Sequence, residues 1–525
     1  MSKLRVSLLF ILIVIAATVI VSRLFFLQFL QHGFYSALAR GQQQVFETIP
    51  PERGEILLTD KNSETSALAV NREYPYVYAV PKDVEDKEKS AKILAEIIGQ
   101  DEKAILDKLS KPDDLFEKIG QRLNEEQAQK IMDLKIKGIG IKAEKLRYYP
   151  YGSLAAHLSG FLGDSQEGSV GRYGLEGYYE QILHGTPGSL VGEKDARGTI
   201  LKSLGENENA ARAGDDLILT IDPNVQSIVE EKLKIEIEKW SADAGTVIVM
   251  DPITGAVRAM ASYPNFNLNN YSEVEDAGVY ANPAVSHIFE PGSVFKPITL
   301  AAGLDSKAIT PSTTFENTGS VKIGSYTISN VVQEAIGTRT MTETLEESLN
   351  TGAIFAEQKT GDETFKKYVQ DFGFDEKTGI DLFAETQGNI ANLSENRPIN
   401  FATASFGQGI AVTPIAMANA ISAIANNGQL MRPYVVQVIR YANGQEEKTV
   451  PKVIRKILSQ RTVTDLTAMM VSVVRNGTGK RAQIEGYTIA GKTGTAQVAN
   501  SDRRGYSDKD IHTFAGFFPA FDPKV

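Results

Sequence analysis

A serine and a lysine three residues apart, Ser293 and Lys296, are the side chains in this sequence best spaced for chemistry. They form the only S-x-x-K string in the chain, and the preceding Pro291-Gly292 favours a sharp start of a helix. Residues three apart in a helix share one face, so the hydroxyl and the amine are expected to lie side by side. Such a pair can work as nucleophile and general base if the lysine is neutral. Burial or a second nearby cation would be needed to lower a lysine pKa that is ordinarily about 10.4.

Two further short motifs could complete such a site, but both recur. S-x-N is found at 348–350 and 394–396, and K-T-G at 359–361, 377–379 and 492–494. The context of each copy therefore has to decide which copies belong to the site.

The copies at 348–350 and 492–494 have the more suitable surroundings. Ser348-Leu349-Asn350 lies between two helical patterns, the first of which starts with a capping box at 340–343. Lys492-Thr493-Gly494-Thr495 lies in a strand pattern of small residues, along which a ligand backbone can bind. The other copies occur at a glycine-terminated helix end (359–361), in a charged turn (377–379) and in a polar loop (394–396).

The elements around these motifs predict a mixed α+β domain. Strand-like runs at 246–250 and 256–261 form a hairpin, and strand-like runs return at 487–498 and 512–520. Between them the apolar spacing predicts helices at 298–308, 341–358, 362–372, 414–427 and 461–475. Because strands occur at both ends of this region, we expect one antiparallel sheet with helices packed on it. Asp222-Pro223 gives the start of a further helix, near a domain boundary at 210–220.

Composition excludes several classes of function. The 525-residue chain has a net charge of −10 and no basic block, so nucleic acid is not an expected partner. It has no cysteine, which excludes disulfides, cysteine nucleophiles and thiolate metal sites. The five histidines have no ligand-like spacing, and neither a metal nor a cofactor is expected.

The N-terminus carries a membrane signal. An apolar run from 6 to 21 resumes at 24–30, which together reach the roughly 20 residues that a membrane span requires. Lys3 and Arg5 precede it, which predicts a cytoplasmic N-terminus and an extracytoplasmic remainder. The alternative is a cleaved signal peptide, but no convincing small-x-small site follows the run.

Residues 81 to about 145 form a charged block with a helical pattern and without a catalytic cluster.

In this order, the motifs at 293–296, 348–350 and 492–494 resemble those of penicillin-binding proteins and serine β-lactamases. Other strings resemble class B penicillin-binding proteins, and the resemblance spans nearly the whole chain. These strings are R-G-E-I at 53–56, G-L-E at 174–176, the run 289–297, S-F-G-Q-G at 405–409 with T-P at 413–414, and H-T-F-A-G at 512–516. The Q-Q-Q run at 42–44 is more similar to the division-type, FtsI-like branch than to the elongation type.

The resemblance implies a peptidoglycan D,D-transpeptidase that is also acylated by β-lactams. Ser293 would be the nucleophile and Lys296 the base, while Ser348 and Lys492 would relay a proton. Asn350, Thr493, Gly494 and Thr495 would hold the D-Ala-D-Ala end of a stem peptide, and the N–H groups of Ser293 and Thr495 would form an oxyanion hole. A membrane glycosyltransferase of the division or elongation machinery is implied as a partner.

The implied organisation is a cytoplasmic tail (1–5), a membrane anchor (6–30), a dimerisation or pedestal domain (31–215) and a transpeptidase domain (216–525). In the family another strand and a C-terminal helix follow, so the sequence is expected to be a fragment of a longer protein. The alternatives are a D,D-carboxypeptidase, a β-lactamase or a catalytically inactive scaffold of the division complex. The lactamase string E-x-x-L-N occurs at 346–350, where it overlaps the S-x-N motif. The same residues cannot serve as both the lactamase motif and the S-x-N motif.

Overall fold

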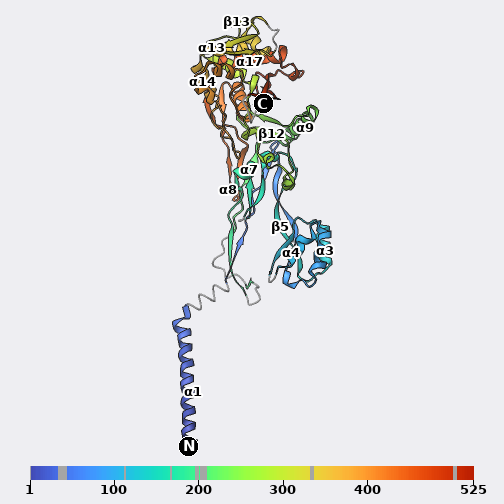
Figure 1. Ribbon diagram of the computed structural model, residues 1–525, viewed down its shortest axis with the longest axis vertical. Coiled ribbons are helices and arrows are strands. Elements are labelled where there is room, and N and C mark those ends of the chain that lie inside the picture. Colours follow the sequence, from blue (N-terminus) through green and yellow to red (C-terminus); the bar gives the residue numbers. More distant parts are fainter. Residues whose placement is uncertain are drawn as a thin grey trace. The chain divides into compact units, whose positions relative to one another are not determined.

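The structure is a computed structural model, and it describes residues 2–33, 44–111, 114–165, 168–194, 200–201, 210–331, 336–499 and 505–525. The chain divides into two compact units. The first comprises residues 1–53 and 184–214, and the second comprises 54–183 and 215–525. All the motif residues from 293 onward therefore belong to the second unit (Figure 1).

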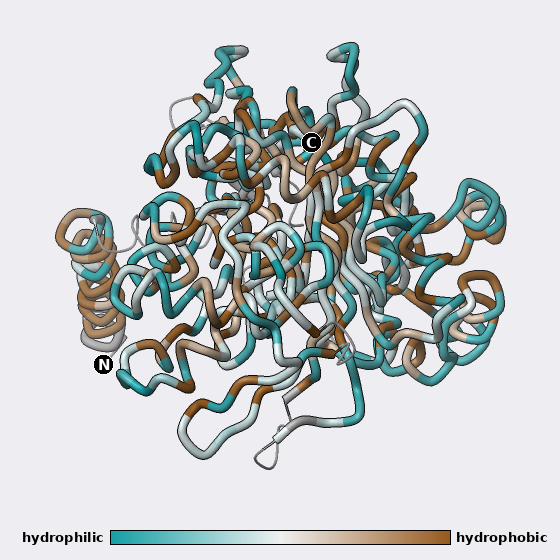
Figure 2. The backbone as a smooth tube through the Cα atoms, turned by 90° about the horizontal axis from the view of Figure 1, so that it is seen from above, coloured by the Kyte–Doolittle hydropathy of each residue, from teal (hydrophilic) through white to brown (hydrophobic). Residues whose placement is uncertain are grey.

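The first unit begins with a long apolar helix. Helix α1 (Ser2–Phe25) continues as a π-helical turn, η1 (Phe26–Leu30). Within it, Ser7–Leu30 has a mean hydropathy of 2.7, and it is the one helix in the described residues long and apolar enough to cross a membrane. Most of its turns are coloured as hydrophobic in Figure 2. The unit also contains a sheet of β1 (Gln44–Ile49), β8 (Gly188–Lys194) and β9 (Ile200–Leu201). Residues 42 and 43 of the glutamine run lie outside the described residues.

A seven-stranded sheet organises the N-terminal part of the second unit. Strand β3 pairs with β2, β4 and β5, and β2 lies parallel to β10. Since β10 and β18 also pair, strands from both sides of the expected boundary at 215 share one sheet. The strands are β2 (Ile56–Thr59), β3 (Thr65–Ala79), β4 (Glu117–Gly120), β5 (Ile139–Tyr148), β10 (Asp216–Leu219), β18 (Val436–Arg440) and β19 (Glu446–Lys448).

The block expected to be helical from 81 to about 145 is only partly helical. It contains α3 (Lys87–Ile98), α4 (Glu102–Leu109) and α5 (Glu125–Asp133), but also β4 and most of β5. The expectation was wrong for β5 because its charged residues alternate with apolar ones on a strand that is half exposed. Its ten-residue pairing with β3 is a long-range contact that local periodicity does not reveal.

A buried ion pair explains two of the strings noted in the sequence. Arg147 Nε lies 2.7 Å from Glu176 Oε1, and both side chains are almost completely buried. Arg147 also donates a hydrogen bond of 2.8 Å to the Gly54 carbonyl. The R-G-E-I and G-L-E strings are thereby joined through one arginine. Removing one partner of such a pair leaves an uncompensated buried charge, so these residues are structural.

The C-terminal part of the second unit carries the motifs and has helices packed around short strands (Figure 1). Hairpin strands β11 (Gly245–Met250) and β12 (Val257–Tyr263) pair, as do β21 (Ala490–Ala499) and β22 (Tyr506–Phe517). The main helices are α9 (Pro223–Trp240), α11 (Lys296–Asp305), α12 (Met341–Glu346), α13 (Asn350–Thr360), α14 (Asp362–Asp371), α16 (Pro414–Ala425) and α17 (Gln460–Asn476). Asp222 caps α9 as expected, by accepting from the N–H groups of Asn224 and Val225.

The single antiparallel sheet expected here is not formed by the described residues. The pairs β11–β12 and β21–β22 are two separate ladders, with no hydrogen bonds between them. Strands β21 and β22 pack against an apolar core that includes the fully buried Phe295, Phe365 and Phe401, whereas β12 packs in a second apolar cluster. Helix α16 contacts β11 of one ladder and β22 of the other.

Shorter elements connect these parts. Around the pedestal they are η2 (Pro81–Asp83), α6 (Ala156–Ser159), β6 (Phe161–Ser165), β7 (Gly168–Arg172), α7 (Gly174–Tyr178) and α8 (Glu180–Leu183). Near the motifs they are η3 (Leu268–Glu273), η4 (Ala277–Tyr280), α10 (Pro283–Ser286), η5 (Gly292–Phe295), β13 (Thr314–Asn317), β14 (Ser320–Ile323), β15 (Tyr326–Ser329), β16 (Gly337–Thr340), η6 (Ala391–Ser394), α15 (Pro398–Ala404), β17 (Gln429–Met431), β20 (Val453–Lys456) and η7 (Lys480–Ala482).

Glu357, on α13, is expected to make stability depend on pH. It is 2% exposed, and its Oε1 has no hydrogen-bond partner among the described residues. Burial, followed by the charge of Asp362, raises the Glu357 pKa from 4.5 to about 8. Between these values the folded state binds more protons than the unfolded state, so the free energy of unfolding falls as pH rises. Glu357→Gln should raise that free energy by ~1–3 kcal/mol at pH 8 and leave it unchanged near pH 4.

Urea unfolding of the full chain in detergent micelles at both pH values measures this effect. Glu363→Gln, at an exposed position in the first turn of α14, is the matched control. Equal changes in the two variants at pH 8 would contradict the assignment.

Candidate active site

Ser293 lies in a tight turn that leads directly into a helix, as its spacing from Lys296 predicts. The 3₁₀ turn η5 (Gly292–Phe295) is followed by α11, which begins at Lys296. The backbone N–H of Lys296 donates to the Ser293 carbonyl, so the missing N–H of Pro297 leaves that carbonyl paired. Gly292 precedes the serine with a φ of +58°, a conformation that glycine adopts without strain.

Strand β21 lies directly against this turn. A Cβ atom on Gly292 would lie 2.8 Å from the carbonyl oxygen of Thr495, and a Cβ on Gly494 would lie 3.1 Å from the Pro291 carbonyl oxygen. At Gly292 a side chain would clash with this backbone, and at Gly494 a Cβ would also lie 2.2 Å from Thr513 Oγ1. The N–H and C=O of one strand residue point to the same edge of the strand. The Thr495 N–H therefore also faces the turn that carries Ser293.

A chain of polar contacts joins the three motifs. Lys296 Nζ donates to the Ser348 carbonyl oxygen at 2.5 Å and lies 3.3 Å from Ser348 Oγ. Lys492 Nζ lies 3.0 Å from the same Oγ and donates to the Thr493 carbonyl at 2.9 Å. Ser348 Oγ thus bridges two lysine amines, and both lysine side chains are fully buried.

Burial makes both amines unusually easy to deprotonate. Burial lowers the pKa of Lys296 well below 10.5, and the charge of Lys492 lowers it further. Burial alone lowers the pKa of Lys492 to about 7. Neither amine has a carboxylate partner in this contact network, so no nearby negative charge offsets the effect of burial on the two pKa values. The arrangement therefore places two buried amines on either side of the Ser348 hydroxyl, with Lys296 three residues after Ser293.

The S-x-N motif occupies a sharp break between α12 and α13. Ser348 has a φ of +57°, which is strained for a residue other than glycine. This break explains why the single helix expected at 341–358 is two helices. Asn350 Nδ2 donates to the Ser329 carbonyl at 3.0 Å, which leaves the Asn350 side-chain oxygen as an acceptor for a ligand.

Strand β21 separates its side chains by the two-residue period. Lys492, Gly494 and Ala496 face the interior, whereas Thr493 and Thr495 lie on the more open face. Thr493 Oγ1 donates to Thr478 Oγ1 at 2.9 Å, and Thr495 Oγ1 lies 3.4 Å from His512 Nδ1. The two threonine hydroxyls form a polar strip next to the Ser293 turn, suited to a carboxylate.

The motif copies not selected from the sequence have structural surroundings. Lys359 lies in the last turn of α13, which ends at Gly361 with a φ of +85°. Thr378 Oγ1 donates to Glu385 in a loop. Ser394 lies in the short turn η6, with Lys366 Nζ 3.4 Å away. None of these residues appears in the contacts that join Lys296, Ser348 and Lys492 in the described part of the chain.

Thr478 and Asn330, which lie near the motifs, were not identified from the sequence, and His512 was noted only as part of the H-T-F-A-G string. Thr478 and His512 contact the two threonines of β21. His512 is the cross-strand partner of Thr495, and register of this kind is not legible in a sequence. Asn330 lies in a buried network behind Asn350, and no local signal distinguishes it from other asparagines.

The Asn330 network is expected to position the S-x-N motif. Asn330 accepts from the Thr351 N–H at 3.0 Å and donates to Asn317 Oδ1 at 3.0 Å. Asn330→Ala would leave the Thr351 N–H without its acceptor next to Asn350, whereas Asn317 Oδ1 would keep the Gly319 N–H and the Thr351 hydroxyl as donors. We expect the penicillin acylation rate to fall about tenfold and stability to fall by ~1–3 kcal/mol.

Stopped-flow acylation and urea unfolding measure the two effects separately. Asn392→Ala, which removes a side-chain hydrogen bond to the Gly409 carbonyl at an exposed site, is the control. An acylation rate in Asn330→Ala equal to that of the control would contradict a positioning role.

Sequence profiles of two domain families match the chain. The penicillin binding protein transpeptidase domain matches residues 245–525, and the penicillin-binding protein dimerisation domain matches 48–219. Stage V sporulation protein D of Bacillus subtilis is 34% identical over 531 residues, which cover 99% of this chain and 80% of the relative. The chain belongs to the class B penicillin-binding proteins. The membership expected from the three motifs is therefore confirmed.

Other similarities agree with this family and with the activity. A protein of Mesostigma viride named peptidoglycan D,D-transpeptidase FtsI homolog is 29% identical to this chain. The matched region covers 99% of this chain and 90% of the length of that protein. A crystal structure of penicillin binding protein 3 from Mycobacterium tuberculosis, complexed with aztreonam, has a TM-score of 0.69 at 25% identity, covering 91% of this chain and 89% of that one.

This penicillin-binding protein is a D-Ala-D-Ala transpeptidase that cross-links peptidoglycan, with stem peptides as substrates and β-lactams as ligands. Its apolar N-terminal helix fits a membrane-anchored protein. Glu346, the acidic residue of the lactamase-like E-x-x-L-N string, accepts a hydrogen bond from the Ser472 hydroxyl and is not among the hydrogen-bond partners of Lys296, Ser348 and Lys492 in the described residues.

Proposed function

We propose that Ser293 is the nucleophile of the transpeptidase and Lys296 its general base. Ser293 Oγ attacks the carbonyl carbon of the D-Ala-D-Ala bond, and its proton passes to neutral Lys296 Nζ. The tetrahedral intermediate then collapses, the C–N bond breaks and D-alanine leaves with a proton on its amine. The observation that carries this proposal is the buried Lys296–Ser348–Lys492 contact chain beside the Ser293 turn.

The same chain supplies the proton for the leaving amine. Ser348 Oγ bridges the two lysine amines, so a proton taken up by Lys296 can pass through the hydroxyl. In the second half-reaction the amine of a neighbouring stem peptide attacks the acyl-serine ester. Its proton returns along the same path, the ester C–O bond breaks and Ser293 regains its hydrogen.

Four residues are proposed to hold the donor peptide. The Asn350 side-chain oxygen accepts from a substrate N–H, and the Thr493 and Thr495 hydroxyls donate to the terminal carboxylate. Gly494 lets the strand approach the turn closely. The N–H groups of Ser293 and Thr495 form the oxyanion hole, in which one donor contributes about 100- to 1000-fold to the rate.

We also propose the setting in which this chemistry occurs. Lys3 and Arg5 before the anchor favour a cytoplasmic N-terminus and an extracytoplasmic catalytic domain. The domains are proposed to be a tail (1–5), an anchor (6–30), a pedestal (31–215) and a transpeptidase domain (216–525). The glutamine run at 42–44 and the FtsI-named relative support a role at division, with a membrane glycosyltransferase as partner.

A partition experiment tests the reaction type. The full chain is acylated with a pentapeptide thioester, and product is measured with and without a D-amino acid acceptor. We expect the acceptor to be incorporated in preference to water, and a penicilloyl adduct to persist for many minutes. Rapid turnover of penicillin would point to a lactamase, whereas water as the sole acceptor would point to a carboxypeptidase. No adduct at all would point to an inactive scaffold.

A further inference from the structure

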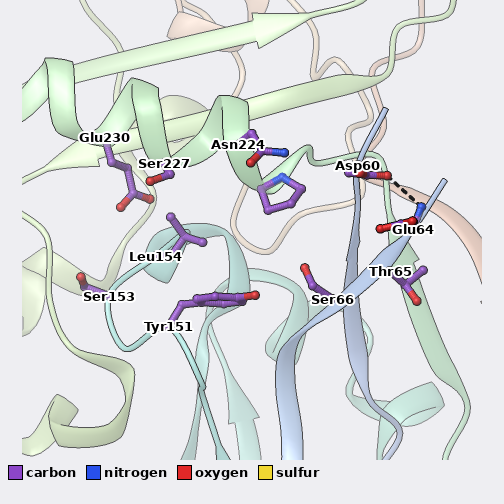
Figure 3. Close-up of a pocket in the computed structure, with 11 residues that line it drawn as sticks. Asp60, Glu64, Thr65, Ser66, Tyr151, Ser153, Leu154, Asn224, Ser227 and Glu230 are labelled. Carbon is purple, nitrogen blue, oxygen red and sulfur yellow. Dashed lines mark hydrogen bonds between the residues drawn. The ribbon is translucent and has the colours of Figure 1, made fainter. Parts of the chain in front are cut away.

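The proposed subsite for the substrate carboxylate lies on an open strand face. Thr493 is half-buried and Thr495 is exposed on the outer face of β21. A cavity of about 550 Å³ beside α9, with Ser66 and Tyr151 in its lining, contains no residue of the three motifs (Figure 3). Because the two threonines lie on an open face, selection for the carboxylate depends on the side chains that flank them.

His512, on β22, is the side chain that flanks Thr495. The two residues are direct partners across the β21–β22 ladder. Direct partners in an antiparallel pair project from the same face of the sheet. His512 Nδ1 lies 3.4 Å from Thr495 Oγ1, and both side chains are exposed. His512 therefore reaches the hydroxyl that is proposed to bind the carboxylate, and a ligand can still approach both groups.

The direction of this contact matters because a hydroxyl has only one proton to donate. If Thr495 donates to His512 Nδ1, that proton is not available to the substrate carboxylate. If His512 donates from an Nδ1–H group, Thr495 accepts that bond and keeps its own proton for the carboxylate. Histidine carries a proton on Nδ1 in one neutral tautomer and in its charged form. The Thr493 hydroxyl differs, since its partner Thr478 is a hydroxyl that can donate or accept.

An acidic residue beside His512 makes a donor at this position more important. Asp510 is exposed and lies two residues away on β22, opposite Gln497. Side chains two residues apart on a strand share a face and lie roughly 7 Å apart. Asp510 therefore repels an anion that approaches Thr495. The neighbouring Lys509 is engaged elsewhere, because its Nζ lies 2.5 Å from Asp243. An N–H donor on His512 would offset the repulsion next to the carboxylate subsite.

We propose that His512 is a positioning residue for the donor substrate, whose Nδ1–H donates to the Thr495 hydroxyl and directs the hydroxyl proton toward the terminal carboxylate. The inference rests on the proposed function, in which Thr495 binds that carboxylate. His512 is not among the hydrogen-bond partners of Lys296, Ser348 and Lys492 in the described residues. It would thus set the preference for donors that end in a carboxylate and leave the proton transfers at the nucleophile unchanged.

Two thioester donors isolate the role of the carboxylate. Both contain an N-acylated D-alanine, and the leaving thiol is thioglycolate in one and ethanethiol, which lacks the carboxylate, in the other. Thiol release by the full chain in detergent micelles gives kcat/KM for each donor. The protein has no cysteine, so all the thiol detected comes from the donor. We expect the wild type to have the higher kcat/KM for the thioglycolate donor.

Substitutions of His512 test the donor at Nδ1. His512→Leu should lower kcat/KM for the thioglycolate donor about tenfold and change it less than about twofold for the ethanethiol donor. His512→Asn should restore the value to within about threefold of the wild type, because Asn Nδ2 is as many bonds from Cβ as His Nδ1 and can donate. The control is His287→Leu, the same substitution at another exposed histidine, which should leave both values unchanged.

A double-mutant cycle tests whether His512 acts through Thr495. Thr495→Val has no hydroxyl, so adding His512→Leu should cause no further loss with the thioglycolate donor. The proposal is overturned by an unchanged value in His512→Leu, by an equal loss in His512→Asn, by equal losses with both donors, or by additive losses in the double variant.

The same measurements separate this inference from the function on which it rests. Equal kcat/KM of the wild type for the two donors would contradict the carboxylate role of Thr495, and the role of His512 with it. Absence of both thiol release and a penicillin adduct in the wild type would contradict the assignment of Ser293 itself. Losses confined to the His512 variants and equal for both donors would overturn only the positioning role.

Discussion

Lys296→Met should reduce the second-order rate constant of penicillin acylation about 10⁴-fold. Lys296 is fully buried and is the amine nearest in sequence to Ser293, in the first turn of α11. Without it, the Ser293 hydroxyl loses the base that we propose for it, and Lys492 contacts Ser348 and not Ser293. Methionine has a similar length and no charge, so the packing around α11 should be retained. The rate constant is measured by stopped-flow with a fluorescent penicillin.

The control for Lys296 is a lysine from an unselected motif. Lys359→Met lies in the K-T-G string at the end of α13 and should acylate within twofold of the wild type. Urea unfolding verifies that both variants are folded. A rate in folded Lys296→Met within tenfold of the wild type would contradict its role as the base.

Lys492→Met should lower the acylation rate about 100-fold at pH 7 and move the pH dependence of the rate to higher pH. The rate should rise with pH in the wild type, because Lys296 acts as a base only when it is neutral. The charge of Lys492 helps to lower the Lys296 pKa, although burial is the larger cause. Removing that charge raises the Lys296 pKa, so the neutral form appears at higher pH. The variant also loses the 3.0 Å contact with Ser348 Oγ.

Acylation rates from pH 6 to pH 10 measure this shift. Lys377→Met, from the K-T-G string in the loop after α14, is the control and should keep the wild-type profile. A Lys492→Met profile with an unchanged midpoint, or one moved to lower pH, would contradict the electrostatic coupling of the two lysines. Partial recovery of the rate at pH 9 to 10 is expected from the coupling and not from a loss of folding.

The three motifs could be selected from the sequence because each carries a local structural signal. The capping box at 340–343, the glycine after Lys359 and the small residues around Lys492 separate the selected copies from the others. The structure then joins Lys296, Ser348 and Lys492, although 52 and 144 residues separate the bonded pairs. Helix periodicity likewise predicted α11, α14, α16 and α17 to within a few residues.

The residues that escaped prediction depend on long-range pairing. His512 meets Thr495 only because of the β21–β22 register, and Asn330 meets Thr351 only through the packing of β15 and α13. The charged residues of β5 were predicted to be helical. The segment is a strand because it pairs with β3, which is distant in sequence. The positive φ of Ser348 also has no signature in its residue type. Tertiary context decided each of these features.

Mapping the penicilloyl adduct tests the central claim, that Ser293 is the acylated nucleophile, most directly. The full chain is treated with a fluorescent penicillin, digested and analysed by mass spectrometry, alongside Ser293→Ala and Ser394→Ala. We expect one adduct, on the peptide that contains Ser293, with labelling abolished in Ser293→Ala and unchanged in Ser394→Ala. An adduct on Ser348 or on any other residue, or labelling that persists in folded Ser293→Ala, would contradict the account.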